Sequence, residues 1–150
     1  MRSVKNGWCL DADLNTMNAN GTKVQLWPCN GQPQQRWYFD GANWRSAAGP
    51  NRCMDVDIAA TPTYGTKIQL WDCNGWQNQR WLVPVPVNNA NTVTGTVYSC
   101  VGIPASQGCP IWAVNWVMDA DLNTIATAGT KVQIWQSNGQ PQQRWTFTYV

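Results

Sequence analysis

The chain has 150 residues and a formal net charge of +2, and charged residues make up only 12% of it. This length suits one domain that buries its own core. No apolar run approaches the roughly 20 residues that span a bilayer. The basic residues recur singly, without the positive cluster that nucleic-acid binding requires. The sequence therefore predicts neither membrane insertion nor nucleic-acid binding.

The choice of polar residues argues against catalysis. The chain has no His, and all eight of its acidic residues are Asp. Without His, the usual Ser-His-Asp and Cys-His nucleophile systems cannot be built, and the commonest zinc ligand is missing. Eleven Trp residues suit a packed core or a flat binding platform. We therefore expect a binding protein without a metal or a cofactor.

A gapless repeat of 27 residues organises the chain, at positions 11–37, 55–81 and 119–145. Inside each copy a turn with Gly precedes a segment of alternating polar and apolar residues, which is typical of a half-buried strand. An Asn-Gly turn and a short Gln-x-Trp segment follow. No stretch shows helical periodicity. The fold class is therefore predicted as all-β, in a single domain (1–150) with three lobes at about 1–40, 41–84 and 85–150.

The third unit carries about twenty extra residues, because its closing Trp145 lies 64 positions after Trp81, whereas Trp81 lies 44 positions after Trp37. We place these residues within 82–112 and interpret that segment as a long surface loop. Loops of this size are uncommon, and this one is either functional or specific to this protein.

The six cysteines are interpreted from the repeat. Cys residues at equivalent positions of the first two copies are replaced together in the third copy, by Val117 and Ser137. Joint loss is what a bonded pair would show. Fifteen connectivities are possible in principle, and the repeat singles out one of them. It predicts the disulfides Cys9–Cys29, Cys53–Cys73 and Cys100–Cys109.

These disulfides predict an oxidising compartment, and we expect a secreted, extracellular protein. The alternative, free thiols or a metal site, is disfavoured because no CxxC pair and no His exist. The first residues contain no hydrophobic signal core. If the protein is exported, its signal was removed or the chain is a piece of a longer one.

The copies end in Gln-Arg-Trp at 35–37, 79–81 and 143–145, after segments such as Cys-Leu-Asp and Val-Gln-Leu-Trp-Pro-Cys. This pattern resembles the Gln-x-Trp signature of ricin-B-type lectins and of the related family 13 carbohydrate-binding modules of bacterial glycoside hydrolases. The likeness covers nearly the whole chain apart from the insertion. It implies a β-trefoil with three lobes around a pseudo-threefold axis, each able to carry one shallow sugar site.

The resemblance also implies site residues: an Asp after the first Cys, a Gln and an aromatic residue, and an Asn-Gln pair. The second lobe has the complete set Asp55, Gln69, Trp71, Asn78 and Gln79. The first lobe has Asp11, Gln25, Trp27, Gln34 and Gln35, and the third has Asp119, Gln133, Trp135, Gln142 and Gln143. Because Gln34 and Gln142 stand where the family has Asn, we expect the second lobe to contribute most to binding.

These residue types fit a pyranose. An indole covers the face of C–H bonds. A carboxylate accepts hydroxyl hydrogen bonds, and an amide both donates and accepts. One such site binds weakly, and several act together on a polymer or a cell surface. Galactose- or GalNAc-type sugars follow from the likeness to the lectins, and xylan-like polysaccharides from the likeness to the modules. Both stay open, as does attachment to a catalytic domain.

Other aromatic and basic residues have simpler interpretations. The Trp of each Gln-Arg-Trp, at positions 37, 81 and 145, is expected in the core. The indoles of residues 27, 71 and 135 alternate with apolar neighbours and are expected to face outward. The repeated Lys at 23, 67 and 131 is expected on solvated turns. Trp76 occurs only in the second copy, and it either extends that site or covers the turn.

Three rival functions remain. Paired Asp residues cleave glycosides in some enzymes, but catalytic pairs are seldom made three times. The Cys100–Cys109 loop is a candidate bait of a trefoil protease inhibitor, which would leave the repeated polar set unexplained. The segment from Asp11 begins like a calcium loop, but Thr16 stands where such a loop needs Gly, and no Glu closes it. The first Asp of each Asp-x-Asp is alternatively a turn residue.

Overall fold

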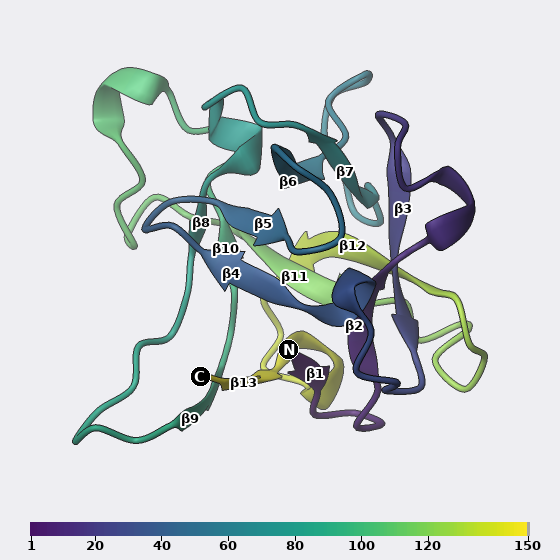
Figure 1. Ribbon diagram of the computed structural model, residues 1–150. Coiled ribbons are helices and arrows are strands. Elements are labelled where there is room, and N and C mark those ends of the chain that lie inside the picture. Colours follow the sequence, from purple (N-terminus) through teal and green to yellow (C-terminus); the bar gives the residue numbers. More distant parts are fainter. Residues whose placement is uncertain (150) are drawn as a thin grey trace.

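The computed structural model describes residues 1–149, which form short strands joined by turns and 3₁₀ helices (Figure 1). Within these residues, no helix has the length and apolar character needed to cross a membrane. The first lobe contains β1 (Arg2–Ser3), β2 (Cys9–Ala12), β3 (Thr22–Trp27) and β4 (Trp37–Phe39). The second contains β5 (Trp44–Ser46), β6 (Arg52–Val56), β7 (Ile68–Asp72) and β8 (Trp81–Leu82). The third contains β9 (Thr92–Gly95), β10 (Tyr98–Ser99), β11 (Trp116–Ala120), β12 (Thr130–Gln136) and β13 (Trp145–Thr148).

Strand pairing repeats the same scheme three times. Each lobe has a central hairpin: β2–β3, β6–β7 and β11–β12. The last strand of one lobe pairs with the strand that precedes the central hairpin of the next, as β4–β5, β8–β10 and β13–β1. The hairpins meet one another through β3–β7, β3–β12 and the bridge between Lys67 and Gln133. The predicted all-β trefoil with three equivalent lobes is confirmed.

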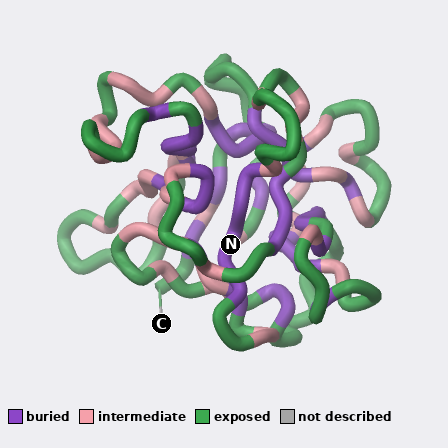
Figure 2. The backbone as a smooth tube through the Cα atoms, turned by 90° about the horizontal axis from the view of Figure 1, so that it is seen from above, coloured by how far each residue is buried: buried purple, intermediate pink, exposed green. Residues whose placement is uncertain are grey.

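The core lies between these hairpins, and Figure 2 shows the buried strand segments in the interior with exposed turns around them. Cross-strand partners inside each hairpin are completely buried: Leu10–Leu26, Met54–Leu70 and Met118–Ile134. Burying one such side chain contributes about 1.5–3 kcal/mol. The alternation of the repeat therefore directs one residue of every pair of neighbours into a common centre.

The closing Trp of each repeat packs on this centre. Trp81 and Trp145 are buried and Trp37 is half-buried, as expected for core residues. Each indole N–H donates to a main-chain carbonyl of the central hairpin, from Trp37 to Leu10 at 2.9 Å and from the other two to Met54 and Met118 at 3.1 Å. A buried indole needs such a partner, so the Gln-x-Trp motif positions its own lobe on the core.

The segment 82–112 differs from the long surface loop that we expected. Its extra residues form two separate excursions on either side of β10. Trp37 and Ser46, paired across β4 and β5, are nine positions apart, whereas the equivalent Trp81 and Ser99 are 18 apart. The first excursion contains β9, which pairs with β13. Residues 92–94 are Thr, Val and Thr, three β-branched residues that favour a strand, and the loop interpretation overlooked this signal.

The second excursion, residues 100–109, is closed by a disulfide. The three predicted bridges Cys9–Cys29, Cys53–Cys73 and Cys100–Cys109 are all present, with Cα–Cα distances of 5.0, 5.0 and 5.5 Å. The first two cross-link equivalent positions of lobes 1 and 2, as the repeat indicated.

Candidate functional site

Three equivalent clefts open on the surface, one in each lobe. Each is lined by an Asp from the first strand of the central hairpin, a Gln and a Trp from the second strand of that hairpin, and an amide from the 3₁₀ helix that follows. Their volumes are about 400, 350 and 500 Å³ in lobes 1, 2 and 3, within the usual range of small-ligand sites. The repeat thus brings the predicted Asp, Gln and Trp of each lobe together.

The carboxylate at the base of each cleft is held in a fixed orientation. In lobe 2, Gln69 Nε2 donates to Asp55 Oδ1 at 3.0 Å. Asn78 Nδ2 and Gln79 Nε2 donate to Asp55 Oδ2 at 2.8 and 2.9 Å. Asp11 is held in the same way by the amides of Gln25 and Gln35. Charge-assisted bonds of this kind are strong, so the carboxylates are held rigidly in place.

The third lobe repeats this arrangement. Gln133 Nε2 and Gln143 Nε2 donate to the two oxygens of Asp119 at 2.9 and 3.0 Å. The amides at the base come from three matching 3₁₀ helices: η2 (Pro33–Gln35), η3 (Gln77–Gln79) and η5 (Pro141–Gln143). Because the middle residue of each helix lines the cleft, Gln34, Asn78 and Gln142 occupy equivalent places.

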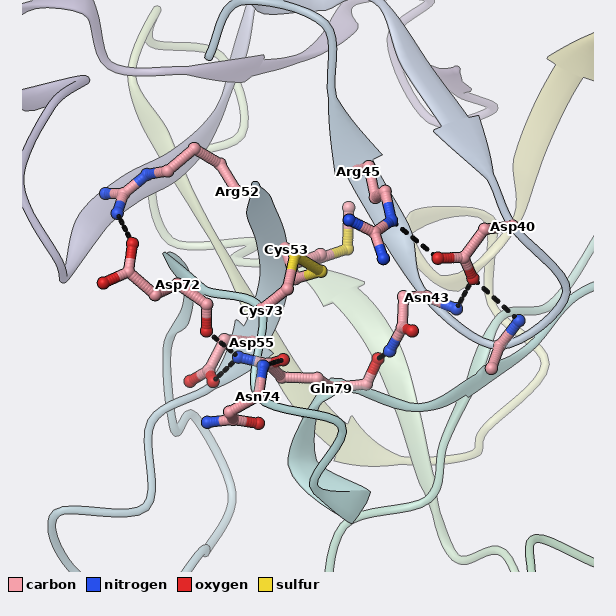
Figure 3. Close-up of a disulfide and its surroundings, with 12 residues drawn as sticks. Asp40, Asn43, Arg45, Arg52, Cys53, Asp55, Asp72, Cys73, Asn74 and Gln79 are labelled. Carbon is pink, nitrogen blue, oxygen red and sulfur yellow. Dashed lines mark hydrogen bonds and ion pairs between the residues drawn. A yellow bond between two sulfur atoms is a disulfide. The ribbon is translucent and has the colours of Figure 1, made fainter. Parts of the chain in front are cut away.

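The last residue of each helix has a different position from the one that we expected. Gln35, Gln79 and Gln143 are buried behind the carboxylate and do not line the clefts. Gln79 also donates to the carbonyl of Asp72 at 2.9 Å and accepts from the main-chain N–H of Asn74 at 2.9 Å (Figure 3). These side chains join the strand, the Asn-Gly turn and the Asp, so they hold the site in position from behind the cleft lining.

The predicted indole platforms face outward. Trp27, Trp71 and Trp135 are 41%, 38% and 36% exposed, whereas the preceding residue on each strand is fully buried. This follows from the strand geometry, because successive side chains point to opposite faces. Each indole therefore presents apolar surface beside a fixed carboxylate and an amide.

Sequence reasoning missed two contributors to the clefts. The Asn of each Asn-Gly turn lines them (Asn30, Asn74 and Asn138), as does the apolar residue three positions after the first Asp (Leu14, Ile58 and Leu122). Both sets recur in every copy of the repeat. We had interpreted the Asn residues only as turn formers, although the repeat itself was the available signal.

The family model of the ricin-type beta-trefoil lectin domain matches residues 1–121 of the chain. The chain belongs to this family. A comparison with curated proteins found no match. This ricin-type domain is similar to solved structures that it covers almost completely, which agrees with the trefoil arrangement of its strands.

Three of these structures illustrate the likeness. The designed threefold-symmetric β-trefoil ThreeFoil is 17% identical with a TM-score of 0.73, and the match covers 99% of this chain and 96% of that one. The C-half of the earthworm R-type lectin, solved with GalNAc, is 20% identical with a TM-score of 0.65 and coverages of 98% and 95%. The ricin B-like lectin of Macrolepiota procera, solved with lactose, is 20% identical with a TM-score of 0.66 and coverages of 99% and 92%.

In this ricin-type domain each cleft is bordered by a glycine of the preceding lobe. Gly65 has φ +87°, and a Cβ there would lie 3.4 Å from Gln133 Oε1 and 3.6 Å from the ring of Trp135. Gly21 and Gly129 lie similarly against lobes 2 and 1. A side chain at these positions would crowd the cleft and strain the backbone, which explains the repeated Gly.

The repeated lysines were expected on solvated turns, and this expectation is wrong for two of them. Lys23 and Lys131 lie within β3 and β12, where their ammonium groups donate to the carbonyls of Gly129 and Gly65 in the neighbouring lobe. The third, Lys67, lies 3.7 Å from Asp57. Long side chains directed along the sheet reach across the lobe boundary, a contact that the repeat alone does not reveal.

The residue before each glycine that borders a cleft differs between the three lobe boundaries. Tyr64 stacks on Trp135 in lobe 3, with ring centroids 5.2 Å apart, and its hydroxyl donates to Gln136 at 2.8 Å. The equivalent Asn20 accepts from Arg52 at 2.7 Å beside lobe 2. Arg52 in turn pairs with Asp72 at 2.8 Å (Figure 3). Ala128 holds the same position beside lobe 1. The third cleft alone therefore carries a second aromatic ring from a neighbouring lobe.

Burial changes the acidity of the carboxyl groups of Asp55 and Asp119. It raises the pKa of Asp55 and of Asp119, and the hydrogen bonds from the surrounding amides only partly oppose this effect. The charges of Asp57 and Asp121 add to the rise. These two groups therefore take up a proton at a higher pH than an ordinary Asp.

The second Asp of each Asp-x-Asp is a turn residue. Asp13, Asp57 and Asp121 accept the main-chain N–H two positions later, each at 3.0 Å. This is the usual Asx arrangement, so the two Asp of a lobe have separate structural roles. Within residues 1–149, no group of three or more His, Cys, Asp or Glu side chains comes together.

Proposed function

We propose that the domain binds carbohydrates without catalysis, through three shallow clefts. One observation carries the proposal: three partly exposed indoles, each beside a buried carboxylate whose orientation amide groups fix. A pyranose needs an apolar surface for its C–H face and charged or amide acceptors for its hydroxyls. Lobe 2 is the strongest site, because its cleft amide is an Asn (Asn78), whereas the other two lobes have Gln34 and Gln142 at that position. The three disulfides and the family support an extracellular location.

Galactose-type sugars are the first ligands to test, since the earthworm lectin and the Macrolepiota lectin were solved with GalNAc and lactose. Xylan-like polysaccharide is the second. The proposal applies equally to a free-standing lectin and to a module joined to a catalytic domain, because each cleft is formed within this chain.

The test is a glycan array followed by titration calorimetry with galactose, GalNAc, lactose and xylotriose. We expect Trp71→Ala and Asp55→Ala to weaken binding most, with smaller losses for Asp11→Ala and Asp119→Ala. Trp112→Ala is the matched control, because Trp112 is 80% exposed and lies outside all three clefts. Equal affinity in all variants would refute the assignment of the site.

The rival functions give different results in direct assays. Repeatable hydrolysis of fluorogenic glycosides would overturn the absence of catalysis. Failure to bind any glycan, together with titration of a protease to a sharp endpoint, would favour an inhibitor that acts through the Cys100–Cys109 loop.

A further inference from the structure

A second cleft adjoins the cleft of lobe 2. This side cleft has a volume of about 350 Å³, and its lining includes Ile58, Trp76 and Asn78 from lobe 2 and Val101, Gly102 and Ala105 from the disulfide-closed excursion. The first three residues also line the lobe-2 cleft. The two clefts are therefore neighbours with a shared wall, and Trp76 stands between them.

The far wall of the side cleft is held in place by lobe 2 itself. The excursion carries the 3₁₀ helix η4 (Ala105–Gln107) and lies beside η3, where the chain turns green in Figure 1. Gln77 Nε2 donates to the carbonyls of Ile103 at 3.1 Å and Gly108 at 2.6 Å. The main-chain N–H of Cys100 donates to the carbonyl of Arg80 at 3.0 Å. A disulfide and bonds at three points make this wall a fixed surface.

Lobes 1 and 3 differ from lobe 2 at the position of Trp76. Trp76 is 62% exposed, and the equivalent residues are Gln32 and Gln140. A large apolar side chain exposed to this extent, on the rim of two clefts, is suited to contact a ligand. None of the residues that line the side cleft carries a charge, so a neutral ligand fits it.

Asn78 supplies a polar group in the shared wall. Its Nδ2 donates to Asp55 and to the carbonyl of Val56. Its Oδ1 is buried and has no hydrogen-bond partner among the described residues. An unpaired buried acceptor is costly, and a hydroxyl group reaching it would satisfy it.

We propose that the side cleft is a subsite for the adjoining unit of an oligosaccharide whose first unit occupies the lobe-2 cleft. This rests on the proposed carbohydrate binding. The indole of Trp76 contacts the oligosaccharide where the sugar passes from one cleft to the other. The surface of Val101 and Ala105 contacts its second unit. Lobe 2 thereby discriminates by chain length, whereas lobes 1 and 3 bind single units.

The test uses a background of Trp27→Ala and Trp135→Ala, which leaves lobe 2 as the working site. Calorimetry compares galactose with lactose and a β-1,3-linked galactotriose, and xylose with xylotriose. In whichever of the two series the domain binds, we expect the longer sugar to bind about tenfold more tightly than the single sugar, because it adds one contact region. Ala105→Leu fills the side cleft and abolishes this gain, while the affinity for the single sugar stays within about twofold.

Two further variants separate the subsite from general damage. Trp76→Gln installs the residue of lobes 1 and 3 and should also remove the gain with length. Ser106→Leu, on the same 3₁₀ helix but outside the lining, is the matched control and should keep it. Equal affinity for short and long sugars, or a gain that survives Ala105→Leu, would overturn the subsite alone. Failure of the unmodified domain to bind any of the five sugars would overturn the proposed function with it.

Discussion

At the scale of single residues, each cleft depends on one carboxylate and the amides around it. The amide that lines the cleft and the amide buried behind it both donate to Asp55 in lobe 2. Hydrogen bonds to a charged group contribute about 1.5–3 kcal/mol each. The residues that shape the proposed binding surface are therefore also residues that stabilise the fold.

Replacing Gln79 should show this double role. Gln79→Met keeps the volume but removes the bonds to Asp55, Asp72 and Asn74. We expect the free energy of unfolding to fall by about 1–3 kcal/mol and sugar affinity at lobe 2 to fall, although the side chain does not line the cleft. Denaturant unfolding and calorimetry measure the two effects. The exposed Gln32→Met is the control, and an unchanged affinity in Gln79→Met would contradict the positioning role.

Acid should weaken binding before it unfolds the domain. Burial raises the pKa of Asp55 and Asp119, so the folded chain takes up these protons at a higher pH than the unfolded chain, whose Asp groups titrate near 3.9. Protonation in that window favours the folded state, because the folded state binds the protons more tightly. It also removes the charged acceptor. We expect affinity to decrease as the pH falls from about 7 toward about 4, with no decrease in stability from these two groups.

Calorimetry and thermal unfolding over the same pH series check this prediction. In the background of Trp27→Ala and Trp135→Ala, in which lobe 2 is the working site, the Asp55→Asn variant should bind sugar weakly at every pH. An affinity that is constant with pH, or that falls only together with the unfolding temperature, would show that these carboxyls do not contact the sugar.

At the scale of elements, the lobes are equivalent in backbone pairing and different in their cross-links. Lobes 1 and 2 have a disulfide that spans 20 positions, whereas lobe 3 has Val117 and Ser137 at those places. The hairpin β11–β12 still pairs over five residues without a bridge. The bridge is therefore not required for the lobe to form, and its contribution is one of stability.

Transferring the unbridged pair to lobe 2 measures that contribution. Cys53→Val with Cys73→Ser should keep the fold and lower the free energy of unfolding by about 3 kcal/mol, the chain-entropy value for a loop of this length. Denaturant unfolding under oxidising conditions measures the free energy of unfolding, and circular dichroism checks that the fold is kept. A midpoint equal to that of the unaltered chain would show that the bridge does not constrain the unfolded state.

At the scale of the whole molecule, the proposed function predicts that three clefts on one trefoil favour ligands that present many sugars. Under the proposed function we expect each site to bind weakly by itself and simultaneous engagement to raise the overall affinity through effective concentration. The gain depends on all lobes being held by one core, which the shared hairpin contacts provide.

Removing two platforms should therefore separate avidity from affinity. Trp27→Ala with Trp135→Ala should leave the affinity of lobe 2 for a free monosaccharide nearly unchanged. Binding to a surface densely coated with the same sugar should fall by about a hundredfold or more. Surface plasmon resonance at high and low sugar density measures the difference. Equal losses at both densities would mean that the three clefts act separately.

The predictions that succeeded concern contacts close in the chain or repeated along it. The strand alternation indicated the outward face of Trp71 and the buried face of Leu70, and the repeat indicated the bridge between Cys53 and Cys73. Two side chains lie in positions that differ from the expected ones, because each extends to residues far from it in the chain. Lys23 bonds across a lobe boundary, and Gln79 turns away from the cleft to join three backbone segments.

The sequence by itself determined the three-lobed all-β fold, the central hairpin of each lobe, the three disulfides and the Asp, Gln and Trp that line each cleft, because periodicity and repetition are local properties of a chain. Only the tertiary structure decided which glycine borders which cleft, and that residues 100–109 stand beside Trp76. Those arrangements join residues from different lobes. Their energy comes from packing between surfaces that meet only after the three lobes have assembled around the pseudo-threefold axis.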